Sequence, residues 1–129
     1  MKTLNKESII GITALLVHAA RIDEKYTDSE KKLIKSFIKS YLQDNNLDEI
    51  LNNAEKLEKN SNQLLNFTNI IKKENDEIKS DIVRHLWKII ISDKSVDQYE
   101  SNLVRRICGL IYFSDKLSAE IKLQILNNE

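Results

Sequence analysis

The chain has 129 residues, of which 41% are hydrophobic and 31% are charged, a composition that excludes a disordered chain and allows a core without disulfides. Its 20 basic residues balance 20 acidic ones, which disfavours a nucleic acid or an anionic membrane surface as partner. With one cysteine and no recognisable signal peptide, we expect a single soluble cytoplasmic domain over residues 1–129.

Apolar residues recur at helical spacing along nearly the whole chain, and Ser, Thr, Asn and Asp stand at plausible helix starts. The first helix is expected over residues 5–21, where the apolar stripe is broad enough for a central, mostly buried element. A second helix begins at Thr27 or Asp28 and has the clearest apolar face. Narrower stripes predict two peripheral helices, one over residues 47–58 and one capped by Ser61.

The C-terminal half continues with three further helices. A second central helix is expected over residues 75–92, where Trp87 supplies the largest apolar side chain. Another begins at Asp97, and a last helix, capped by Ser118, closes one end of the bundle. The longest apolar stretch, Ile9 to Ala20, is too short and too interrupted to span a membrane. The sequence therefore predicts an all-α compact bundle of about seven helices with no membrane span.

An internal repeat relates the two halves of the chain. Residues 15–34 and 85–104 align without a gap at an offset of 70, with four identities and coinciding apolar positions. The identical pairs are Leu16 and Leu86, Asp23 and Asp93, Glu30 and Glu100, and Leu33 and Leu103. In each copy an apolar helix ends near an Asp, and a capping residue followed three positions later by Glu opens the next helix. We infer two pseudo-symmetric helical hairpins.

The repeated segments, LLVHAARIDEKYTDSE at 15–30 and HLWKIIISDKSVDQYE at 85–100, resemble the TerB-like family of tellurite-resistance and related domains. The family's usual Asp-Gly turn is replaced here by Asp23-Glu24 and by Asp93-Lys94. The resemblance implies an all-helical, stress-associated and largely non-enzymatic interaction or sensor domain that docks to a protein partner. It also implies that acidic turn residues bind a divalent metal ion. Carried over position by position, these residues are Asp23, Glu30, Asp93 and Glu100.

The same four acidic residues allow three interpretations. Capping-box spacing accounts for Glu30 and Glu100 without any ligand, and the N-terminus of the following helix could stabilise Asp23 and Asp93. Alternatively, pseudo-symmetry brings the four together as oxygen ligands for Mg²⁺ or Ca²⁺. A metal-dependent hydrolase that uses this cluster is the enzymatic alternative, and we favour a protein that is not an enzyme.

The remaining chemically active side chains are expected to be structural. His18 and His85 lie on or beside apolar faces without further ligands at metal-binding spacing, and Cys108 lies on an apolar stripe. The Arg105-Arg106 pair is explained by a solvated helix face. Exposed aromatic residues that could mark a docking face for the partner are Tyr26, Tyr99 and Tyr112.

Overall fold

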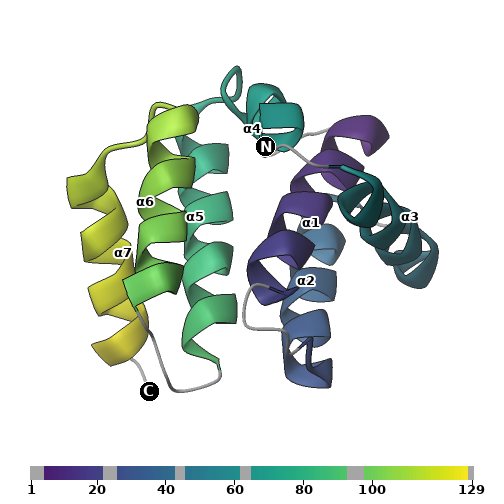
Figure 1. Cartoon of the computed structure of the whole chain (residues 1–129), viewed down its shortest axis with the longest axis horizontal. Coiled ribbons are helices and arrows are strands. Elements are labelled where there is room, and N and C mark those ends of the chain that lie inside the picture. The colour runs from purple at the N-terminus through teal and green to yellow at the C-terminus, as the bar shows by residue number, and fades with distance from the viewer. Residues whose placement is uncertain (1–4, 22–25, 43–45, 62–64, 93–97, 128–129) are drawn as a thin grey trace.

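A computed structural model describes residues 5–21, 26–42, 46–61, 65–92 and 98–127, with the backbone alone for 98–100 (Figure 1). All regular structure within these ranges is helical, which confirms the predicted all-α class and the expected number of helices. The seven helices are α1 (Lys6–Arg21), α2 (Asp28–Tyr41), α3 (Leu47–Asn60), α4 (Leu65–Ile71), α5 (Asp76–Ile91), α6 (Gln98–Leu110) and α7 (Asp115–Asn127). Among these helices, none combines the length and the apolar character that a membrane span requires.

The helices form two groups that meet along α1 and α5 (Figure 1). In the first group, α3 packs mainly on α1 and also contacts α2. In the second group, α7 packs mainly on α5 and also contacts α6. The short helix α4 connects the groups and lies against α1 and α6. As a result α3 and α7 lie at opposite edges of the molecule, each with an outward face.

The internal repeat is visible in the helix bounds. Both ends of α5 are those of α1 shifted by 70 residues, and α6 begins 70 residues after α2. The packing is less symmetric. Each of α2 and α6 contacts the two other long helices of its own group, but α2 also contacts α5 of the other group, whereas α6 contacts α4. The two hairpins therefore share a sequence pattern but have different neighbours.

The hydrophobic core is built around the two central helices, α1 and α5, and includes residues of all seven helices. Every residue of α1 from Gly11 to Val17 is buried, as the breadth of its apolar stripe predicted. Gly11 also permits close packing, because a Cβ there would lie 2.5 Å from Cδ1 of Ile70 on α4. The largest fully buried side chains of α1 and α5 are Ile9, Ile12, Leu15, Leu16, Ile82, Leu86 and Ile89.

Polar residues begin the helices largely where the sequence predicts them. The Asn5 side chain accepts a hydrogen bond from the Ser8 amide at 2.7 Å, and Asn75 accepts one from the Ile78 amide at 2.9 Å. The expected Ser118 cap of the last helix is wrong, since α7 already begins at Asp115. Ser118 is buried and accepts a hydrogen bond from the Trp87 indole at 3.0 Å, so its hydroxyl serves tertiary packing.

Candidate functional site

The predicted acidic cluster is only partly within the described residues. Asp23 and Asp93 lie outside them, and Glu100 is placed by its backbone alone, in the first turn of α6. Glu30 lies in the first turn of α2 with 4% of its surface exposed. The convergence of the four carboxylates at one metal site therefore stays a prediction.

Glu30 closes a capping box at the start of α2. Its Oε1 accepts hydrogen bonds from the Thr27 amide at 2.8 Å and from the Thr27 hydroxyl at 3.0 Å, and its own amide donates to Thr27 Oγ1 at 3.2 Å. The structural interpretation of Glu30 is thereby confirmed. Any cation bound at Glu30 would have to share a carboxylate that already holds the helix terminus.

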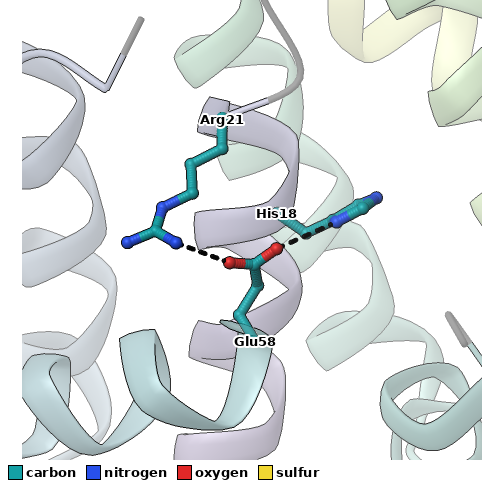
Figure 2. A network of polar contacts seen from close by, with 3 residues as sticks. All are labelled: His18, Arg21 and Glu58. Carbon is teal, nitrogen blue, oxygen red and sulfur yellow. Dashed lines mark hydrogen bonds and ion pairs between the residues drawn. The ribbon is translucent and has the colours of Figure 1, made fainter. Parts of the chain in front are cut away.

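At the C-terminal end of α1, a polar network ties this helix to α3 (Figure 2). Glu58 on α3 accepts a hydrogen bond from Arg21 Nη1 at 2.9 Å through Oε1, and its Oε2 lies 3.3 Å from His18 Nδ1. Both α1 side chains are about one-third exposed, so we expect the Arg21 pair to stabilise the fold by no more than about 1 kcal/mol. The network ties α3 to the C-terminal end of α1.

Tyr26 is held between cations at the same place. The Arg21 guanidinium carbon lies 5.2 Å from the centre of its ring, and Lys31 Nζ lies 4.9 Å from it. Its hydroxyl is buried near Glu55 without hydrogen-bond geometry to any described residue, and burial together with Glu55 raises its pKa. Tyr26 is therefore not the exposed docking aromatic that we predicted. The side chain of Tyr99 lies outside the described residues.

An open depression of about 220 Å³ adjoins this network on the surface between α1 and α3. Its lining residues are Arg21, Asn52, Glu55, Lys56 and Lys59. Arg21 is already paired with Glu58, and Glu55 lies near the buried hydroxyl of Tyr26.

A second depression, of about 170 Å³, lies in the other group of helices. We call it the Trp87 groove; it is lined by Trp87 of α5, by Ser101 and Arg105 of α6, and by Asp115, Ser118, Ala119 and Lys122 of α7. Lys122 Nζ lies 4.9 Å from the indole ring centre. The groove thus combines an aromatic wall with two cations and one carboxylate.

Next to this groove, α7 carries apolar residues on its outward face. Ala119, Leu123 and Leu126 recur at helical spacing and are all exposed, Leu123 by 56% and Leu126 by 42%. We call these three residues the α7 outer face. Ile121 and Ile125 are buried on the opposite side of α7, which packs on α5.

The buried titratable residues have structural surroundings. His85 contacts the Asp81 carbonyl oxygen through Nδ1 at 2.9 Å and packs edge-on against Phe37, and burial lowers its pKa. Cys108 is fully buried, and burial raises the pKa of its thiol. Within the described ranges, no three His, Cys, Asp or Glu side chains are grouped so that they could hold a metal ion.

Comparison with known protein families identifies the family to which this fold belongs. The family model described as tellurite resistance protein TerB matches residues 10–123. The chain belongs to the TerB family. The resemblance predicted from the repeated segments is confirmed, and TerB domains are generally non-catalytic. No curated protein and no solved structure matches this chain.

Two features of this TerB domain had no counterpart in the sequence prediction. Glu58 was not singled out, because its partners His18 and Arg21 lie 40 and 37 residues away and meet it only when α3 packs on α1. The sequence predicts a solvated helix face for Arg105, whereas in the structure it lines a groove together with residues of two other helices. Neither contact follows from local spacing.

Proposed function

We propose that this TerB domain is a non-enzymatic docking module that binds a protein partner through the α7 outer face. The observation that carries the proposal is that α7 is apolar on two sides: Ile121 and Ile125 attach it to the fold, and Leu123 and Leu126 remain exposed. Covering the exposed part of each leucine would contribute about 1 kcal/mol. Such a stripe suits the apolar face of a partner helix.

Tyr112, at the α6–α7 connection, is another exposed residue that could contact a partner. Its ring is 72% exposed, and it lies three residues before the start of α7. Exposed tyrosines often contribute much of the binding energy at protein interfaces because they are large and rigid. The balance of 20 basic and 20 acidic residues supports a protein partner over a polyanion.

A divalent cation and the location of the protein are secondary parts of the proposal. Family membership and the acidic residues next to the two helix connections support binding of Mg²⁺ or Ca²⁺ by Asp23, Glu30, Asp93 and Glu100. A cation there would change the angle between the two helices of each hairpin, which would give the domain a sensor role. The location that we propose for the protein is the cytoplasm. The enzymatic alternative is a metal-dependent hydrolase that uses the same acidic residues.

Docking is tested by affinity capture with matched variants. We expect a partner captured by the wild type to be lost from the Leu123→Asp/Leu126→Asp double variant and kept by Leu65→Asp, which alters an exposed leucine on α4. Thermal unfolding of each variant checks that the fold is intact. Equal capture by the wild type and the double variant would refute docking through α7. If light scattering shows that the wild type is a dimer and the double variant a monomer, the partner that binds the α7 outer face is a second copy of this chain.

The enzymatic alternative has its own assay. The wild type is incubated with phosphoester substrates and Mg²⁺, alongside Asp93→Asn. Metal-dependent hydrolysis that this substitution abolishes would overturn the proposal of a docking module.

A further inference from the structure

The Trp87 groove contains two cations, Arg105 and Lys122. Among the described residues, no carboxylate lies within ion-pair distance of Arg105, and Lys122 contacts the indole ring rather than an acid. The ring itself is fixed, because its Nε1 donates to Ser118 Oγ at 3.0 Å. The groove is therefore a rigid aromatic wall flanked by two cations, and Asp115 is the one acid among its described lining residues.

The internal repeat offers a comparison for the cation of this groove. Trp87 corresponds to Val17, which is fully buried, and Arg105, one residue beyond the aligned segment, lies 70 residues after Lys35. Lys35 forms an ion pair with Asp48 of α3, at 2.7 Å. In the first half the third helix thus supplies an acid to this cation. In the second half, no acid among the described residues forms an ion pair with Arg105.

We propose that the Trp87 groove binds an acidic side chain, Asp or Glu, of the protein that docks on α7. The carboxylate lies between Arg105 and Lys122, and its aliphatic stem packs on Trp87. Arg105 can bind a carboxylate through two parallel hydrogen bonds, which gives both affinity and orientation. Counted over the described lining residues, Arg105, Lys122 and Asp115 leave one net positive charge, which suits a monoanionic carboxylate better than a phosphate dianion.

This inference rests on the proposed docking function, because Ala119 belongs both to the groove and to the α7 outer face. A partner helix that covers Leu123 and Leu126 therefore passes the mouth of the groove. The inference adds a chemical requirement: the partner must carry an acidic residue at that point.

The single tryptophan of the chain is a built-in reporter. The indole ¹H–¹⁵N NMR signal of Trp87 is followed during titration with N-acetyl-glutamate amide, with N-acetyl-glutamine amide as the neutral match. We expect a saturable shift with the glutamate probe only. Arg105→Gln should weaken binding about tenfold, and Arg106→Gln, which changes the exposed neighbour outside the groove, should leave it unchanged.

Equal shifts with both probes, or wild-type affinity in Arg105→Gln, would overturn the inference. So would stronger binding of inorganic phosphate than of the glutamate probe, because the groove would then be a phosphate site. If Arg105→Gln captures the partner as the wild type does while Leu123→Asp/Leu126→Asp loses it, the inference fails and the docking function stands. If the glutamate probe binds but α7 captures no partner, the docking function fails and the groove is a site for small carboxylates.

Discussion

Tyr112 adopts a backbone conformation that favours glycine, with a φ of 60° at the end of α6. The conformation belongs to a Schellman motif, in which the Phe113 amide donates to the Cys108 carbonyl at 2.8 Å and the Tyr112 amide donates to the Gly109 carbonyl at 3.4 Å. Because these bonds satisfy the last carbonyls of the helix, the motif holds Tyr112 in the left-handed region. Replacement by glycine should therefore stabilise the fold.

The expected size of the effect comes from two opposing contributions. A side chain at this φ costs about 1–1.5 kcal/mol relative to glycine. The ring also gives some stability, since Lys72 Nζ lies 5.5 Å from its centre, and an exposed cation–π contact contributes about 0.5 kcal/mol. We therefore expect Tyr112→Gly to raise the free energy of unfolding by about 0.5–1 kcal/mol. Tyr112→Ala, which keeps the strain and loses the ring, should lower it by about 0.5 kcal/mol.

Urea unfolding followed by circular dichroism measures both variants against the wild type. At this chain length, a change of 1 kcal/mol corresponds to a shift of about 3–5 °C in melting temperature. An alanine variant as stable as the glycine variant would refute the argument, because the left-handed backbone would then carry no penalty. If Tyr112 also anchors the partner, Tyr112→Gly should be more stable and bind more weakly, so stability and function would separate at one residue.

Three further predictions concern the interface of α2 with α5 and the cation. Tyr41 donates a 2.7 Å hydrogen bond to the Asp81 carboxylate, so Tyr41→Phe should cost about 1–2 kcal/mol in urea unfolding; the same cost in an Asp81→Asn background would contradict this coupling. Burial lowers the pKa of His85, so the unfolded chain binds a proton first as pH falls. Stability should then decrease from about pH 7 to pH 5, and His85→Gln should flatten that decrease; an unchanged slope would be evidence against it. Added Mg²⁺ or Ca²⁺ should raise the melting temperature of the wild type more than that of Asp93→Asn, and no rise with Mg²⁺, Ca²⁺ or Zn²⁺ would remove the cation proposal.

The positions of the helices followed closely from local sequence. The expected range of 5–21 for the first helix corresponds to α1 at Lys6–Arg21, and the expected range of 75–92 corresponds to α5 at Asp76–Ile91. Thr27 begins α2 through the capping box that its spacing to Glu30 predicted. These features depend on residues three or four positions apart, which the sequence displays directly.

The candidate sites were harder to predict because their members come from separate helices. Ser118 has the composition of a helix cap, yet its hydroxyl accepts the hydrogen bond of an indole 31 residues earlier in the chain. Tyr26 has the polarity of a surface aromatic, yet its hydroxyl is buried where α3 packs against α1. In both cases a neighbour distant in sequence decides the role of the side chain.

The sequence by itself determined the helical class, the repeat at an offset of 70 and membership of the TerB family, since all three are written in spacings that do not depend on packing. Only the tertiary structure decided which equivalent cation is paired. Lys35 and Arg105 are related by the 70-residue offset of the repeat, but α3 sets Asp48 against the first, whereas the second lines the Trp87 groove beside α7 and pairs with no acid of a described residue. The charge of a residue is a local property, but its neutralisation depends on the helix that packs opposite.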